Sequence, residues 1–287
     1  MELRKAERQQ AKIKMGIQGP SGSGKTFSAL LLAFGLINDW NKIAVIDTEN
    51  HSSELYSHLG DFNVLSLTEP FSPERFVEAI TACELSDIDV IIIDSISHEW
   101  EAVGGILDIH SNMAGNSFTN WHKITPRHNA FVQKMLQSCC HIICTIRTKQ
   151  DYVLSEKNGK TVPEKVGLKS IQRDGMDYEF TIVFDIDIKH NAVASKDRTG
   201  LFMDKPPILL GTNTGQKIIE WCNEGDLKEF IIGKVKECVT VLELKDLYNK
   251  YPNYQNELID HFSQKREELE KKNIAIPPKF KLNGNNH

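Results

Sequence analysis

One eight-residue segment constrains the possible folds of this chain more than any other feature. It reads Gly19, Pro20, Ser21, Gly22, Ser23, Gly24, Lys25, Thr26, a full match to the pattern G-x-x-x-x-G-K-[ST]. Apolar residues 13–18 predict a strand directly before it, and leucines and alanines at helical spacing over residues 25–37 predict a helix directly after it. Glycines let successive N–H groups point inward, and the helix N-terminus adds partial positive charge. The segment therefore predicts a loop that binds nucleotide phosphates.

Side chains of this loop and of a later strand predict ATP and Mg²⁺ as cofactors. We expect Lys25 to contact the β- and γ-phosphates and the Thr26 hydroxyl to ligate Mg²⁺. Asp94 ends an apolar strand predicted over residues 89–94. Because ligands bind at the carboxyl ends of parallel strands, its carboxylate should face the Mg²⁺ shell, through a water molecule.

A further carboxylate is a candidate for the general base. Glu49 follows a strand predicted over residues 42–47, on the same edge of the sheet as the loop. Phosphoryl transfer to water needs a group that orients and deprotonates the nucleophile, and Glu49 is the catalytic candidate, with Glu99 the next to test. The alternative is that Glu49 only caps the turn that follows it.

Strands and helices alternate along the first 222 residues. Strands predicted over residues 13–18, 42–47, 89–94 and 140–146 are separated by helices predicted over residues 25–37, 52–58, 73–85 and 121–138. Such alternation is typical of an α/β fold with a mainly parallel sheet flanked by helices. The residues from Lys157 to Lys160 predict a hairpin turn, and further strands are expected over residues 178–188 and 192–196.

The composition changes after Trp221. Periodicity predicts a helix over residues 227–238, Thr240 and Glu243 form a capping box that begins a second helix, and a third is expected over residues 254–272. We predict an ATP-binding core over residues 1–222, a small helical segment over residues 226–272 and a disordered tail over residues 273–287.

The order of these motifs resembles that of RecA-type ATPases. In that family the phosphate loop is followed by a strand ending in I-D-x-E, here residues 46–49, and then by I-I-I-D-S, here residues 91–95. Residues 5–13, 19–26 and 173–180 are similar to phage-encoded RecA-like ATPases, which are implicated in recombination and single-strand annealing. The resemblance spans residues 5–221. It implies a RecA-like P-loop core that hydrolyses ATP, with the glutamate after the second strand as the base.

A second resemblance concerns the segment from Lys196 to Gly200. Its sequence, Lys-Asp-Arg-Thr-Gly, is similar to the K-N-R-x-G element of RadA and of DnaB-type replicative helicases, with Asp in place of Asn. This implies that Lys196 and Arg198 are catalytic residues that reach the γ-phosphate bound by a neighbouring subunit of a ring or filament. The alternative is a charged turn at a strand end.

In RecA-type proteins the segments after the aspartate strand and after the next strand face DNA. Here they are residues 103–123, which carry Phe118 and Trp121, and residues 147–173, which are locally basic. The resemblance implies single-stranded DNA as a partner, and a solvated surface is the alternative. Where RecA proteins place a glutamine that senses the γ-phosphate, this chain offers Arg147, Lys149 or Gln150.

Composition excludes several classes of protein. The chain has 287 residues and a formal net charge of -5, so no global basic field draws it to nucleic acid. Its apolar runs, such as residues 90–93, are far shorter than the ~20 residues of a membrane span, and residues 1–14 lack the apolar stretch of a signal peptide. We expect a cytoplasmic protein without membrane contact, in the bacterial host if phage-encoded. Its six cysteines are expected to be free thiols rather than zinc ligands.

These observations favour a Mg²⁺-dependent ATPase that acts on single-stranded DNA in phage recombination, annealing or replication. A single-strand-binding or replication protein is a further candidate partner. Two other functions stay open: a nucleotide-gated adaptor, such as a helicase loader, that binds a protein partner, and a small-molecule P-loop kinase.

Overall fold

The computed structural model describes residues 12–157, 160–223 and 227–274. The chain divides into two units, with the boundary between Cys222 and Asn223.

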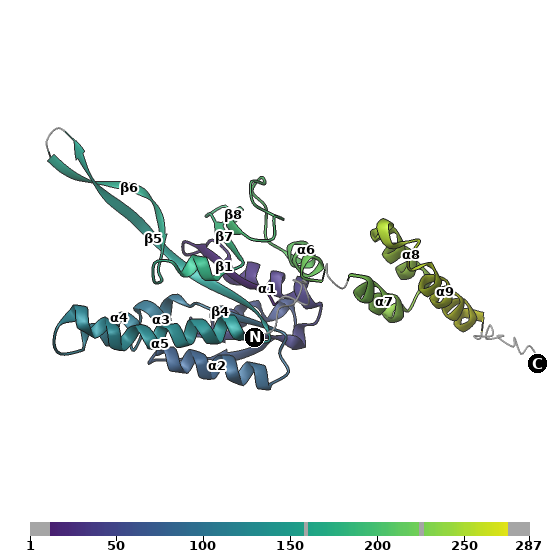
Figure 1. Cartoon of the computed structure of the whole chain (residues 1–287), viewed down its shortest axis with the longest axis horizontal. Helices are drawn as coiled ribbons and strands as arrows, with labels where there is room; N and C mark the ends of the chain where they lie inside the picture. The colour runs from purple at the N-terminus through teal and green to yellow at the C-terminus, as the bar shows by residue number, and fades with distance from the viewer. Residues whose placement is uncertain (1–11, 158–159, 224–226, 275–287) are drawn as a thin grey trace, which may run out of the picture. The chain divides into compact units, whose positions relative to one another are not determined.

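Eight strands of the described residues form one sheet in the first unit (Figure 1). Its order is β3-β2-β4-β5-β1-β7-β8, and β6 pairs with β5 outside this path. Neighbours from β3 to β7 are parallel, whereas β8 is antiparallel to β7 and β6 to β5. The strands are β1 (Lys14–Gly19), β2 (Ile43–Asp47), β3 (Asn63–Ser66), β4 (Val90–Asp94), β5 (His141–Lys157), β6 (Lys160–Ser170), β7 (Ile182–Ile186) and β8 (Ala192–Asp197). The predicted α/β fold with a mainly parallel sheet flanked by helices is confirmed.

Helices cover both faces of this sheet because its central strands are apolar on both sides. Val45 and Ile92 pack in a core with α1 (Lys25–Ile37) and α6 (Thr212–Cys222). Their neighbours Ile46 and Ile93 pack in a second core with α2 (Pro73–Leu85) and α5 (Ser117–Gln137). Shorter helices complete the unit: α3 (Ser97–Glu101), α4 (Ile106–Ser111) and the 3-10 turns η1 (Trp40–Lys42), η2 (Ser52–Leu59) and η3 (Met176–Glu179).

Several predicted boundaries are wrong, among them the start of the helix predicted over residues 254–272, which begins only at Ile259. Helix α5 begins at Ser117, because the Asn116 side chain accepts a hydrogen bond of 2.8 Å from the N–H of Phe118 and caps an earlier first turn. Strand β5 continues to Lys157, since β6 supplies it with an antiparallel partner along residues 148–157. Tyr178 lies in η3, and β7 begins only at Ile182.

The second unit consists of α7 (Leu227–Glu237), α8 (Val241–Lys250), η4 (Pro252–Tyr254) and α9 (Ile259–Ile274) in its described part. The predicted capping box is confirmed: Thr240 Oγ1 accepts from the N–H of Glu243, and the Glu243 carboxylate accepts from the N–H of Thr240. A core of its own holds these helices together, with Ile231, Leu244, Leu258 and Phe262 among its buried residues. Helix α9 extends two residues into the predicted tail, of which residues 275–287 lie outside the described part.

None of the helices among the described residues combines the length and the apolar character needed to cross a membrane.

Candidate nucleotide-binding site

The phosphate loop lies between β1 and α1, and its shape depends on glycine and on one distant histidine. Gly22 and Gly24 have φ values of 77° and 87°, which only glycine adopts without strain. Ser23 is fully buried, and its carbonyl oxygen accepts a hydrogen bond of 2.9 Å from His190 Nδ1, in the turn between β7 and β8. His190 was not predicted as part of the site, since nothing in the sequence brings residue 190 to the loop.

Lys25, the first residue of α1, folds its side chain back onto the loop. Its Nζ donates to the carbonyl oxygens of Gly19 and Pro20, both at 2.9 Å. Burial lowers the pKa of Lys25, and the carboxylates of Asp94 and Glu49 act in the opposite direction. Phosphate oxygens would replace the two carbonyl groups with stronger, charge-assisted hydrogen bonds.

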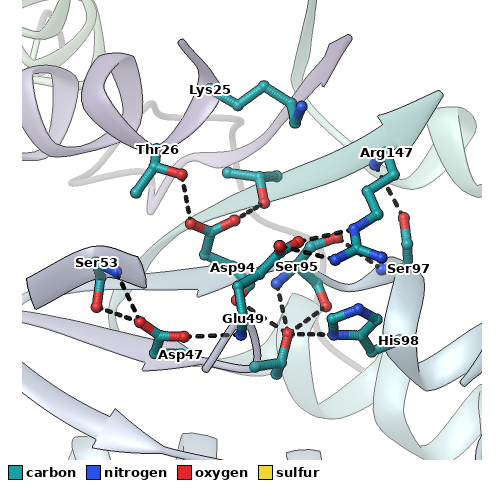
Figure 2. Close-up of polar contacts among 12 residues, drawn as sticks. Lys25, Thr26, Asp47, Glu49, Ser53, Asp94, Ser95, Ser97, His98 and Arg147 are labelled. Atoms are coloured by element: carbon teal, nitrogen blue, oxygen red, sulfur yellow. Dashed lines mark hydrogen bonds and ion pairs between the residues drawn. The ribbon is translucent and has the colours of Figure 1, made fainter. Parts of the chain in front are cut away.

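Asp94 ends β4 and is buried beside the first turn of α1 (Figure 2). Its Oδ2 accepts from Thr26 Oγ1 at 2.6 Å, and its Oδ1 accepts from Thr145 Oγ1 on β5. Burial raises the pKa of the Asp94 carboxyl, and the two hydroxyl groups oppose that shift. Thr145 was missed in the sequence, where its signal is a hydroxyl residue within the apolar run of residues 140–146.

The Thr26 hydroxyl and the Asp94 carboxylate fit the predicted Mg²⁺ ion. Both are hard oxygen donors, and Mg²⁺ is commonly bound by one or two such protein groups while water and phosphate oxygens complete its shell. Their contact of 2.6 Å shows that the fold brings the two groups to the same point.

Glu49 lies just beyond β2, and Arg147 holds its carboxylate. The N–H of Glu49 donates to Asp47 Oδ1 at 2.7 Å, which fixes the backbone past the strand end. Arg147 donates from Nε to Glu49 Oε1 at 2.8 Å, and its Nη2 lies 2.7 Å from Oε2 (Figure 2). The hydrogen bond to Glu49 raises the pKa of Arg147. Among the three candidates for a γ-phosphate sensor, Arg147 is therefore the one that contacts the predicted base.

These groups surround a cavity of about 610 Å³, which we call the nucleotide cavity. Its volume lies in the range of small-molecule sites. Phosphate-loop residues, both predicted carboxylates and the base of the β5–β6 hairpin line it: Ser21, Gly22, Gly24, Lys25, Thr26, Glu49, Ser52, Tyr56, Asp94, Glu101, Arg147, Thr148 and Ile171.

The structure does not bring Glu99 to this cavity. Glu99 is fully buried, and its Oε1 lies 3.0 Å from Nδ1 of His128 on α5. Glu101, two residues further on, lines the nucleotide cavity instead. The reason is that residues 97–101 form a helix, α3, which turns these two side chains to different sides.

Lys196 and Arg198 lie apart from the residues described as lining the nucleotide cavity. Lys196 Nζ donates to the carbonyl oxygens of Asp177 at 2.7 Å and Tyr178 at 2.5 Å, and Arg198 Nη2 donates to Tyr178 at 3.0 Å. Both side chains thus bind backbone of η3 within their own subunit.

A second cavity, of about 570 Å³, combines aromatic and cationic side chains; we call it the aromatic cleft. Trp100 and Trp121 lie with ring centroids 6.1 Å apart and planes at 23°, and His110 stacks on Trp121 at 4.4 Å. The cleft is lined by Trp100, Glu101, Leu107, Trp121, Lys149, Asp151, Lys169, Ser170, Ile171, Gln172, Arg173 and Asp174. Both segments expected to face DNA therefore contribute to one surface.

The second of these segments contains the hairpin that the sequence predicts at Lys157 to Lys160. Residues 148–157 of β5 pair antiparallel with residues 160–170 of β6, and the two strands project from the sheet in Figure 1. Residues 158 and 159, within the predicted turn, lie outside the described residues. The side chains of residues 152–166 lie outside those that the structure describes.

Residues 11–219 match the family model described as AAA domain. This chain belongs to that family. It therefore contains an AAA-type P-loop ATPase domain, in which binding of a nucleotide, and usually of Mg²⁺, is implied. A KaiC-like protein of the hyperthermophilic archaeon Pyrococcus horikoshii OT3 is 17% identical, with 70% of this chain and 87% of that chain covered and a TM-score of 0.43. No curated protein matches the sequence of this chain.

Proposed function

We propose that this chain hydrolyses ATP at the nucleotide cavity and binds single-stranded DNA in the aromatic cleft. The observation that carries the proposal is the position of the two cavities side by side. Glu101 and Ile171 line both of them, so a ligand in one lies next to residues that form the wall of the other.

The residues of the nucleotide cavity supply the parts of an ATPase. Lys25 would exchange the carbonyl groups of the loop for the β- and γ-phosphates. Glu49 would take a proton from the attacking water, whose oxygen bonds to the γ-phosphorus while ADP leaves with the electrons of the broken P–O bond. Thr26 and Asp94 would hold Mg²⁺, which neutralises charge on the phosphates when bound.

Lys196 and Arg198 would complete the site of a neighbouring subunit in a ring or filament. Their hydrogen bonds go to carbonyl oxygens, which are neutral acceptors, and the γ-phosphate of a neighbour would be a stronger one. An arginine supplied in this way is worth ~10³–10⁵ in rate.

The aromatic cleft has the chemistry of a single-strand binding surface. Bases stack on aromatic rings without sequence preference, and Lys149, Lys169 and Arg173 would contact phosphates. Lys169 forms an ion pair of 2.8 Å with the exposed Asp174, which a phosphate could displace. Phe118, which is 80% exposed on the first turn of α5, adds a further ring near Trp121.

This activity would serve recombination, annealing or replication of phage DNA in the host cytoplasm, with a single-strand-binding or replication protein as a partner.

The first test measures ATP hydrolysis with Mg²⁺ in the presence and absence of oligo-dT. We expect DNA to stimulate turnover, and Lys25→Ala to lower it by about 10²–10³ because the cation on the phosphates is lost. Turnover that ignores DNA would favour the nucleotide-gated adaptor, and turnover that requires an acceptor other than water would favour the kinase. Unchanged turnover in folded Lys25→Ala protein would rule out the proposed ATPase site.

The second test measures binding of fluorescent oligo-dT to variants of the cleft. Trp121→Ala should weaken binding by about 1–3 kcal/mol, through loss of stacking. Lys169→Ala should reduce the slope of log affinity against log salt by about 0.7, the value of one phosphate contact. Lys42→Ala is the matched control, because Lys42 also forms an ion pair with an exposed carboxylate, that of Asp87, but lies outside the cleft. If Lys42→Ala and Lys169→Ala changed the salt dependence of oligo-dT binding equally, the aromatic cleft would not be the DNA-binding surface.

A further inference from the structure

The proposed base of the reaction is engaged by a cation. Both oxygens of Glu49 are paired with the guanidinium of Arg147, at 2.8 Å and 2.7 Å. A bidentate guanidinium occupies lone pairs that a proton from water would need. In this arrangement Glu49 is a poor acceptor for a proton from water.

Arg147 can reach a ligand from the place where it lies. Its side chain is 39% exposed, and it lines the nucleotide cavity together with Lys25 and Thr26. The planar fork of a guanidinium binds two oxygens of a phosphate in the same way that it binds a carboxylate. A terminal phosphate in the cavity would therefore compete with Glu49 for the same donors.

The pair also has space on its other side. Glu49 and Arg147 form part of the wall of a further cavity, of about 460 Å³, with His98 and Phe71 among its lining residues. The ion pair thus separates two cavities, and neither partner is enclosed by close packing. Side-chain rearrangement here creates no conflict with the core.

The backbone of Arg147, in contrast, is fixed. Its N–H donates to Ser97 Oγ at 3.0 Å, its carbonyl oxygen accepts from the N–H of Ile171 at 2.7 Å, and it pairs in register with Gly19 of β1. Arg147 is thus held at the point where β5 leaves the parallel sheet and enters the hairpin. Only its side chain is free to change partner.

We propose that Arg147 is a latch on Glu49 that the terminal phosphate of ATP opens. This inference rests on the proposed ATPase function. With an empty cavity or with ADP, the guanidinium stays on the carboxylate. With ATP it transfers to the γ-phosphate, so that Glu49 becomes available as a base only when a hydrolysable phosphate is present.

The direct test observes the Arg147 Nε–H group by NMR, assigned by its loss in Arg147→Lys protein. Adding Mg²⁺ and a non-hydrolysable ATP analogue should shift this resonance, whereas Mg²⁺ and ADP should leave it as in the nucleotide-free protein. A resonance unchanged by the bound analogue, or shifted equally by ADP, would overturn the latch.

A binding experiment tests the same inference by calorimetry. Arg147→Ala should weaken the ATP analogue roughly tenfold, about 1.4 kcal/mol, and leave the Kd of ADP within about twofold. The comparison is repeated in a Glu49→Gln background, where no unpaired carboxylate can repel the phosphates. Arg147→Ala should weaken binding of the ATP analogue in this background as well. If it does not, Arg147 only shields the phosphates from the charge of Glu49.

Arg127→Ala is the matched control. Arg127 forms a bidentate pair with Glu74, at 2.6 Å and 2.9 Å and with similar exposure, between α5 and α2 away from the nucleotide cavity. Arg127→Ala should change neither the Kd of the ATP analogue nor that of ADP.

The outcomes separate the two proposals. If the wild-type protein binds neither nucleotide, both the proposed function and the latch are wrong. If the wild-type protein binds and hydrolyses ATP while Arg147→Ala binds the analogue as tightly relative to ADP as the wild type does, only the latch is wrong.

Discussion

At the residue scale, Glu49 and Asp94 differ in their surroundings, as their proposed roles require. Asp94 is buried and held by two threonine hydroxyl groups, which suits the metal ligand that we propose. Glu49 is partly exposed, at 27%, and faces the nucleotide cavity.

Glu49→Gln should bind ATP and fail to hydrolyse it. Glutamine preserves size and hydrogen bonding but cannot accept the proton, so turnover should fall by at least about 10² while ATP remains bound. A filter-binding assay with single-turnover hydrolysis distinguishes the two steps. If Glu49→Gln hydrolysed ATP at the wild-type rate, a group other than Glu49 would be the base. Glu101 is then the first to test, since it lines the nucleotide cavity and Glu99 does not.

At the scale of elements, the start of β1 is held by a histidine of β5. The N–H of Ile13 donates to His141 Nδ1 at 3.1 Å, so this ring nitrogen must be an unprotonated acceptor. Burial lowers the pKa of His141 to about 3 from its ordinary value of 6.5. The contact joins residues 128 positions apart in the chain.

This contact predicts an acid-sensitive sheet. Below pH 6.5 His141 is protonated in the unfolded chain, whereas in the folded chain it stays neutral down to about pH 3. The free energy of unfolding should therefore decrease as the pH falls through this window, by up to about 1.4 kcal/mol per pH unit. His141→Asn keeps an acceptor for Ile13 without a titrating ring, so its stability should decrease less between about pH 7 and about pH 5.

Urea unfolding at the two pH values measures this difference. His122→Asn, at an exposed position of α5, is the control and should follow the wild type. Equal pH dependence in all three proteins would show that protonation of His141 does not destabilise the folded state.

At the scale of the whole molecule, the proposed assembly makes Arg198 act on a neighbouring subunit. Arg198→Ala should bind ATP nearly normally but hydrolyse it slowly, because the arginine is needed mainly in the transition state. Lys25→Ala subunits should be inactive but still present an intact Arg198. Mixing the two variants should therefore restore part of the ATPase activity. Mixed oligomers, verified by tagged pull-down, that stay inactive would assign Arg198 to the turn of its own subunit, where it binds Tyr178.

The sequence by itself determined the phosphate loop, the strand before it and the helix after it. Glycine conformation, apolar periodicity and the position of Lys25 and Thr26 are local properties, so residues 14–37 could be predicted closely. The same holds for the capping box of Thr240 and for the carboxylates at the ends of β2 and β4.

Only the tertiary structure decided which groups contact these residues. Arg147 on Glu49, Thr145 on Asp94 and His190 on the loop are contacts over 98, 51 and 167 positions. They depend on the order in which strands pair, which places β5 between β4 and β1. Apolar strands of similar composition can occupy any central place in a parallel sheet, because each is buried on both faces whatever its neighbour. The pairing, and with it the partner of the predicted base, is therefore a property of the folded sheet and not of any one segment.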